Sequence, residues 1–403
     1  MHVKNTKPHI PQEDINPILA DIKDALEKGN LTFGTEKFEE EFAKYIGTKY
    51  AVAVNSGTSA IEAPLRYYKL KGKEVIVPTN TFVATANAVI FAGGTPVMAD
   101  MDIENLCADF EDIKSKVNEN TAGVIIVASC GYVPPYMFEL KKYCEENGLF
   151  LLEDAAHAHG ASIKGHKAGS IGEVGSFSFF PTKLMTTGEG GMVTTNNKEI
   201  ADYVKQVRHH GQKNGLMTEL GYNWRMPQLS VILGRYQLKR LDGFIKRRNE
   251  IALKYAKALE GIEEIELIKV PEYITHGYWK YPILIKSKYT AKEFQTLLKE
   301  KYDIDTGTVY YPPVHLQPYY KENYGYKEGD MPTSEQSLTR EICLPIFVDI
   351  TDEQLNYVRD RSSIYNKIKE VIYNPGIMPY NKFLSDIRHS KYSLDLKNKF
   401  MIK

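Results

Sequence analysis

Three short runs of wholly apolar residues constrain the fold of this chain most: Val75-Ile-Val77, Val124-Ile-Ile-Val127 and Phe150-Leu-Leu152. Helix-like segments separate them, including a charged stretch from Phe138 to Asn147. Strands that are apolar on both sides are typical of a parallel sheet covered by helices on both faces. Ligands of such sheets bind beyond the carboxyl ends of the strands. The sequence therefore predicts an α/β fold with its site at that edge of the sheet.

The chain of 403 residues is too long for one small core. We predict a large domain over residues 12–245 and a smaller α+β domain over residues 246–372. A helical pattern over 227–259, with a break expected at Leu241-Asp-Gly243, would connect them. Another helix is expected over 351–366. No fold is assigned to the tail, residues 373–403.

The composition argues against several classes of partner. Lys plus Arg and Asp plus Glu balance at 51 each, which does not favour nucleic acid or an anionic membrane as the main partner. The four cysteines form no Cys-x-x-Cys pair, so neither a zinc site nor a disulfide framework is expected. No apolar run approaches the roughly 20 residues that cross a bilayer, and the start shows no signal-peptide pattern. A cytoplasmic protein is therefore expected.

Lys183 closes the run Ser176-Phe-Ser-Phe-Phe-Pro-Thr-Lys183 and precedes Gly188-Glu-Gly-Gly191. Most lysines are solvated surface residues, but this one follows an aromatic run and precedes a glycine cluster. Near a buried cofactor, the pKa of a lysine amine falls, and the amine becomes a nucleophile at neutral pH.

Asp154 closes a second apolar run, Leu149-Phe-Leu-Leu-Glu-Asp154. A carboxylate at the tip of a buried strand is costly unless it is paired. One interpretation is an N-cap for a helix that begins at Ala155. The other is an ion pair with the protonated pyridine nitrogen of pyridoxal phosphate (PLP). Together with Lys183 on a neighbouring strand end, the second interpretation is favoured.

Three further segments carry candidate cofactor residues. Ser56-Gly57-Thr58-Ser59 lies between a strand and a helix, where free N–H groups suit a phosphate, although an ordinary helix cap is the alternative. Phe82 is either a core residue or a ring that stacks on a flat cofactor. His157 could also lie against such a ring; with His159 it has no evident third ligand for a metal, so no metal site is expected.

Six motifs occur in one order: Ser-Gly-Thr-Ser-Ala60, Pro-Thr-Asn-Thr-Phe-Val-Ala-Thr-Ala-Asn-Ala88, Glu-Asp-Ala-Ala-His-Ala-His-Gly160, Phe-Ser-Phe-Phe-Pro-Thr-Lys183, Gly-Glu-Gly-Gly191 and Gly-Tyr-Asn-Trp-Arg-Met226. Together they resemble the DegT/DnrJ-type (StrS-like) family of PLP-dependent sugar aminotransferases over roughly residues 15–360. The resemblance implies an aspartate-aminotransferase-like large domain (PLP fold type I) with a mainly parallel sheet. It also implies a homodimer with shared active sites.

The same resemblance implies a role for each candidate. Lys183 would form the Schiff base with the cofactor, and Asp154 would pair with its pyridine nitrogen. Phosphate contacts would come from Gly57, Thr58 and Ser178, with Phe82 and His157 flanking the ring. Asn223 would reach the cofactor of the partner subunit. Tyr311 and His315 match a family loop on the substrate side.

The resemblance further implies transfer of an amino group, with glutamate as the donor, to a nucleotide-linked keto-sugar for amino-sugar biosynthesis. Pyridoxamine phosphate would be the intermediate form of the cofactor. Two alternatives stay open. One is a keto-sugar 3-dehydratase, against which Lys183 argues because such relatives typically replace this lysine, often with His. The other is a non-catalytic regulatory protein that has kept the fold.

Overall fold

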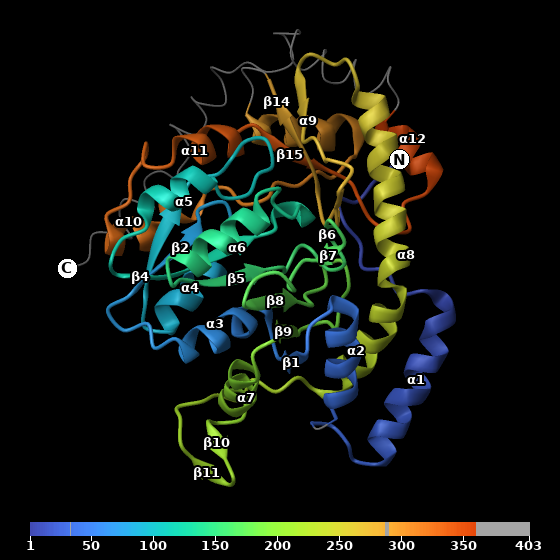
Figure 1. Cartoon of the computed structure of the whole chain (residues 1–403). Coiled ribbons are helices and arrows are strands. Elements are labelled where there is room, and N and C mark those ends of the chain that lie inside the picture. Colours follow the sequence, from blue (N-terminus) through green and yellow to red (C-terminus); the bar gives the residue numbers. More distant parts are fainter. Residues whose placement is uncertain (33, 287–289, 360–403) are drawn as a thin grey trace, which may run out of the picture.

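A seven-stranded sheet forms the centre of the chain in the computed structural model, which describes residues 1–32, 34–286 and 290–359 (Figure 1). The strand order is β1-β9-β8-β5-β4-β2-β3. β9 runs antiparallel to both β1 and β8, and every other neighbouring pair is parallel. The strands are β1 (Tyr50–Val54), β2 (Glu74–Pro78), β3 (Thr95–Ala99), β4 (Thr121–Val127), β5 (Phe150–Asp154), β8 (Val174–Ser178) and β9 (Gly191–Thr195). The predicted mainly parallel α/β sheet is confirmed.

Helices cover both faces of this sheet. Successive strand residues point to opposite sides, so the all-apolar strands present apolar side chains on both faces. Ile76 and Val124 belong to one buried cluster, whereas Val75 and Val77 belong to the other. The first face packs against α2 (Glu36–Ile46), α5 (Phe110–Lys116), α6 (Met137–Glu146) and part of α8 (Gln228–Leu259). The second face packs against α3 (Gly57–Tyr67), α4 (Val83–Phe91) and α7 (Lys198–Val207). The all-apolar runs thus reflect burial on both sides.

α8 is one continuous helix of 32 residues, so the break expected at residues 241–243 is wrong. Gly243 in a helix costs only about 1 kcal/mol relative to Ala. Its neighbours Leu241, Phe244 and Ile245 are buried, and burying such side chains contributes roughly 1.5–3 kcal/mol each. Burial therefore outweighs the low helix propensity of one glycine.

The last turns of α8 pack into a second, smaller core. Ile251, Tyr255 and Leu259 contribute to it from α8, and Val3 joins it from the N-terminal segment. Its sheet has the order β12-β14-β15, with all pairs antiparallel. The elements are β12 (Ile265–Leu267), β14 (Tyr281–Ile285), β15 (Glu341–Leu344), α9 (Ala291–Tyr302) and α12 (Asp352–Arg359). The predicted domain division at residues 245 and 246 falls within α8 and stays a prediction.

The remaining elements surround these two cores. They are α1 (Gln12–Glu27), α10 (Pro318–Tyr324), α11 (Pro332–Leu338), the short strands β6 (Ser162–Ile163), β7 (His166–Lys167) and β13 (Ile274–Thr275), and the hairpin of β10 (Gln212–Lys213) and β11 (Leu216–Met217). The hairpin projects beyond α7 (Figure 1). In the part of the chain that the structure describes, no helix has the length and apolar content needed to span a membrane. The predicted tail, and residues 360–366 of the helix expected over 351–366, lie outside the described residues.

Candidate active site

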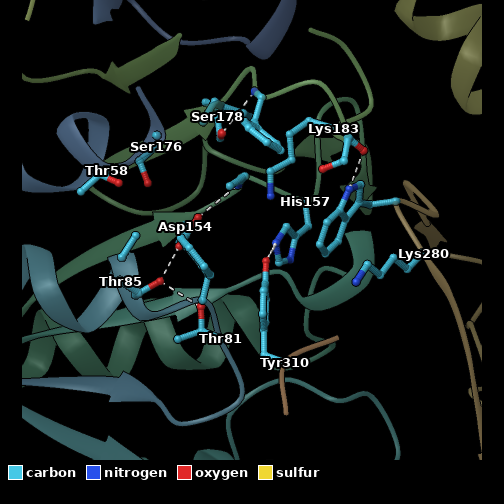
Figure 2. A pocket seen from close by; sticks show the side chains of 18 of the residues that line it. Thr58, Thr81, Thr85, Asp154, His157, Ser176, Ser178, Lys183, Lys280 and Tyr310 are labelled. Carbon is cyan, nitrogen blue, oxygen red and sulfur yellow. Dashed lines mark hydrogen bonds between the residues drawn. The ribbon is translucent and has the colours of Figure 1, made fainter. Parts of the chain in front are cut away.

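A cavity of about 580 Å³ opens beyond the carboxyl ends of β5 and β8. Its lining brings together seven of the residues predicted from the sequence: Gly57, Thr58, Phe82, Asp154, His157, Ser178 and Lys183. Figure 2 shows the Lys183 amine and the Asp154 carboxylate directed into the same space. Because these residues come from four separate segments of the chain, the sheet edge is what gathers them, as expected for a parallel sheet.

Lys183 lies in the loop between β8 and β9. The loop is fixed by the amide of Lys183, which donates to the carbonyl oxygen of Phe180 at 2.9 Å, and by Trp279 Nε1, which donates to the carbonyl oxygen of Thr182 at 2.7 Å. The Lys183 Nζ atom lies 4.3 Å from the centre of the Trp279 ring. The pKa of Lys183 is lowered to about 7, mainly by burial; the negative charge of Asp154 opposes this shift, and the positive charge of Lys280 adds to it. Close to neutral pH, this amine exists in both protonation states.

Asp154 is the last residue of β5, and its carboxylate is buried. Its Oδ2 atom accepts a hydrogen bond from Thr85 Oγ1 at 2.8 Å, and Oδ1 accepts one from the amide of Ala156 at 3.1 Å. No helix begins at residue 155, so the alternative of a helix N-cap is wrong.

The Asp154 carboxylate has no cation within ion-pair distance among the residues that the structure describes. Burial raises its pKa in spite of the two hydrogen bonds. A buried carboxylate without a counter-ion is costly, so the site suits a ligand that brings a positive charge. The preceding residue differs: Glu153 accepts amide hydrogen bonds from Gly169, Ile171 and Gly172 and thus holds a loop.

The start of α3 forms a corner suited to an anion next to the end of β8. Ser56 caps the helix: its Oγ accepts from the amide of Ser59 at 3.1 Å, and Ser59 Oγ accepts from the amide of Ser56 at 3.2 Å. A Cβ atom on Gly57 would lie 2.6 Å from Cβ of Ser178, so only glycine permits this close approach. First-turn amides of a helix lack partners within the helix, and the dipole there favours a negative charge. With the hydroxyls of Thr58 and Ser178 beside it, the corner fits a phosphate.

Aromatic rings form another wall of the cavity. The His157 ring stacks on Trp279 with ring centres 3.8 Å apart and planes 14° from parallel. Its Nε2 atom lies 3.0 Å from the hydroxyl of Tyr310, whereas its buried Nδ1 atom has no partner among the described residues. Phe82, with 54% of its surface exposed, has its ring centre 5.6 Å from that of Tyr310. Such a wall suits a flat heterocycle. The corner at the start of α3 and the Asp154 carboxylate line the same cavity.

Three predicted residues lie outside this lining. His315 is fully buried, with Nδ1 2.6 Å from Thr79 Oγ1 and Nε2 2.9 Å from Glu335 Oε1. The two ring nitrogens fix the loop to Thr79, directly after β2, and to α11, and the substrate contact of His315 stays a prediction. Tyr311 is 54% exposed, and its substrate contact stays a prediction. Asn223 is exposed and bridges to His209 near the β10–β11 hairpin.

The sequence did not predict Thr85, Trp279, Lys280 and Tyr310, whose side chains contact the predicted site residues or each other in this lining. Tyr310 directly precedes the predicted Tyr311, and Thr85 ends a threonine-rich run, so both had a local signal. Trp279 and Lys280 had none: Trp279 contacts Thr182, 97 residues away in the sequence, and Lys280 contacts Thr308, 28 residues away.

Besides the cavity residues, the chain contains possible metal ligands and four cysteines. Within residues 1–32, 34–286 and 290–359, no group of three His, Cys, Asp or Glu side chains is placed to hold a metal ion. Cys107, Cys130, Cys144 and Cys343 are all buried free thiols.

Comparison with known proteins agrees with this geometry. The sequence matches the DegT/DnrJ/EryC1/StrS aminotransferase family over residues 12–362. It is 36% identical over 370 residues to the spore coat polysaccharide biosynthesis protein SpsC of Bacillus subtilis, which covers 87% of this chain and 94% of the relative. It is 35% identical over 335 residues to the GDP-perosamine synthase of Escherichia coli O157:H7, covering 82% and 88% of the two chains. A putative sugar aminotransferase from Streptococcus pneumoniae, solved in its PMP-form, superposes with a TM-score of 0.83 at 26% identity, covering 92% and 98%.

Proposed function

Since the chain belongs to the DegT/DnrJ/EryC1/StrS aminotransferase family, we propose that it transfers an amino group from glutamate to a nucleotide-linked keto-sugar. It is a PLP-dependent sugar aminotransferase with PLP fold type I, and its reaction serves amino-sugar biosynthesis. The glutamate donor and the nucleotide carrier are the proposed parts, together with the cytoplasmic location. GDP-perosamine synthase and a UDP-linked altrosamine transaminase stand among its relatives, which supports a nucleotide carrier.

One observation carries the proposal: the Lys183 amine and the unpaired Asp154 carboxylate line a cavity that also has a phosphate corner and an aromatic wall. These are the groups that PLP requires. We propose that Gly57, Thr58 and Ser178 hold its phosphate, and that Phe82 and His157 flank its ring. When bound, PLP accepts the amino group of the donor and withdraws electrons from the carbon that loses a proton.

The side chains of the chain then have distinct tasks. The Lys183 amine attaches the cofactor, and once released it can take a proton from the substrate carbon and return it elsewhere. A pKa of about 7 suits both directions, because neither protonation state is strongly favoured at neutral pH. Asp154 would keep the pyridine nitrogen protonated, and Thr85 orients Asp154 through its 2.8 Å hydrogen bond. Lys183 in this place also disfavours the dehydratase alternative.

We propose a homodimer in which Asn223 serves the active site of the partner subunit. Asn223 is exposed and lines no part of the cavity in its own chain. Leu216, Met217 and Leu220 in and beside the neighbouring hairpin are 68%, 71% and 69% exposed. An apolar projection of this kind favours burial against another protein surface, and a two-fold pairing with a second copy would bury it twice.

The direct test of the proposed function is an amination assay on a panel of nucleotide-linked keto-sugars. Glutamate is the donor, and the amino-sugar product is identified by mass spectrometry. We expect at least one keto-sugar to be converted with one 2-oxoglutarate formed per turnover. A visible PLP band that bleaches with glutamate, followed by no conversion of any keto-sugar, would refute the proposed acceptor. A protein that takes up no PLP would favour the non-catalytic alternative.

Replacing Asp154 by Asn is expected to lower turnover by roughly a hundredfold while PLP still binds. The amide keeps the size of the side chain but removes the negative charge that pairs with the pyridine nitrogen. Phosphate and ring contacts remain, so PLP uptake, followed by its visible absorbance, should persist. Thr85→Val is the matched control, because it removes only the hydrogen bond to Asp154 and should reduce turnover less. Equal turnover in Asp154→Asn and the wild type, with PLP bound, would leave Asp154 a structural residue only.

The rate of PLP uptake by the cofactor-free protein should rise with pH through a midpoint of about 7. Only the neutral amine attacks the aldehyde, and burial lowers the pKa of Lys183 to about 7 from the usual 10.5. About half of the amines are therefore neutral at pH 7, against roughly one in a few thousand for an ordinary lysine. Stopped-flow absorbance between pH 5.5 and 9.5 measures the profile. A rate that still rises steeply above pH 9 would contradict the lowered pKa.

A further inference from the structure

Lys280 introduces a second amine into the active-site cavity. It directly precedes β14, and its Nζ atom lies 4.6 Å from the centre of the Trp279 ring and 5.8 Å from that of Tyr310. The amine donates a hydrogen bond to the carbonyl oxygen of Thr308. Figure 2 shows it pointing from the side of the small sheet toward Tyr310. Lys280 therefore presents a positive charge at an aromatic part of the cavity wall.

This charge has no carboxylate in contact with it. Among the described residues, no Asp or Glu oxygen lies within 4 Å of the Lys280 amine. Glu341 interacts electrostatically with Lys280 without contacting it. The two Glu341 oxygens already accept hydrogen bonds, one from Cys343 Sγ and one from the amide of Val309, each at 2.8 Å. The buried carboxylate of the lining, Asp154, is assigned to the cofactor. The charge of Lys280 thus stays uncompensated toward the cavity.

We infer that Lys280 binds a carboxylate of the substrate that reacts in this cavity. A cation beside aromatic rings interacts with an anion far more strongly than it would in water. The amines of Lys183 and Lys280 lie 4.3 Å and 4.6 Å from the centre of the same Trp279 ring. A carboxylate held by Lys280 is therefore close to the carbon that exchanges its amino group at Lys183. The inference rests on the proposed function, because it assigns a recognition group to that reaction.

Two substrates could supply the carboxylate. The amino donor carries one or two, and an acidic sugar of the uronate type carries one on its ring. Unreactive probes separate the two sources. With PLP-loaded enzyme, 2-oxoglutarate has no amino group to give and stands for the donor. UDP-glucuronate has no ketone and stands for an acidic sugar, and UDP-glucose differs from it mainly by lacking the carboxylate.

The experiment compares the binding of these probes to the PLP-loaded wild type, Lys280→Met and Lys280→Arg by calorimetry. Methionine keeps the length of the chain without its charge, and arginine keeps the charge. We expect Lys280→Met to lower the binding affinity for one of the two carboxylate probes about ten- to a hundredfold, which is the usual effect of losing a hydrogen bond to a charged group. Lys280→Arg should retain most of the affinity, and UDP-glucose should bind alike in all three. Lys142→Met, at an exposed lysine, is the matched control.

If Lys280→Met loses affinity for 2-oxoglutarate alone, Lys280 binds the carboxylate of the amino donor. If it loses affinity for UDP-glucuronate alone, Lys280 binds the carboxylate of an acidic sugar. Unchanged affinity for both in a variant with normal melting and PLP uptake overturns the inference, as does a wild type that binds neither probe. Equal weakening of every ligand, UDP-glucose included, with a lower melting temperature also overturns it, because Lys280 is then structural. If Lys280→Met does not fold, Lys280→Gln, which can still donate to Thr308, replaces it. Failure of the amination assay would refute the proposed acceptor without deciding these binding results.

Discussion

Lys183→Ala should abolish transamination, with a loss of roughly ten-thousandfold or more, while the protein remains folded. The variant lacks the amine that is proposed to attach PLP and to move the proton, and a positioned acid–base group alone contributes about 10²–10⁴-fold. The fold should persist because the Lys183 side chain is placed by a contact with the Trp279 ring and forms no ion pair with any of the described residues. Turnover with glutamate, the visible PLP band and the melting temperature are the measurements.

Two controls make the Lys183 result specific. Lys142→Ala removes an exposed lysine and should leave both turnover and the PLP band unchanged. Lys183→Arg keeps a positive charge but offers no neutral amine at this pH, and it should be as inactive as Lys183→Ala. Turnover of Lys183→Ala near that of the wild type would mean that another amine attaches the cofactor. Lys280, as the other lysine that lines the cavity, would then be the residue to replace next.

The central sheet could be predicted because its signal is local. The runs Val75–Val77, Val124–Val127 and Phe150–Leu152 are each apolar on both sides, and each lies within an observed strand. The position of Lys183 and Asp154 at the cavity could be predicted for a related reason, since a charged residue at or just after the end of a buried run lies at the edge where ligands bind. Lys183 follows the end of β8 by a few residues, as such a position requires.

Other features depend on contacts between distant segments, which a single sequence does not reveal. His315 belongs to a motif that suggested substrate contact, yet Thr79 and Glu335 occupy both of its ring nitrogens. Trp279 reaches the Lys183 loop across almost a hundred residues of sequence. The continuity of α8 through Gly243 likewise depends on which faces of the helix are buried. In each case the deciding term is tertiary packing, which outweighs the local preference.

If each active site takes Asn223 from the partner subunit, a mixture of two inactive variants should regain activity. Lys183→Ala lacks the amine, and Asn223→Trp places a bulky side chain where the partner's cofactor is proposed to lie. In a heterodimer, one site receives an intact Lys183 from the second variant and an intact Asn223 from the first, while the other site carries both changes. Recovery of up to about half of the wild-type turnover per heterodimer follows from this two-fold symmetry.

Recovered activity can be distinguished from residual activity of the single variants, because the two variants are purified separately and each is shown to be inactive before mixing. Native mass spectrometry then gives the fraction of heterodimer, against which the regained turnover should scale. A mixture of Lys183→Ala with Asp154→Asn is the matched control: both residues serve the cavity of their own chain, so no site in that heterodimer gains activity beyond the residual turnover of Asp154→Asn. Heterodimers without recovered turnover would place Asn223 in its own chain's site or in none. Recovery would instead explain why an exposed asparagine beside an apolar hairpin lines no cavity in its own chain.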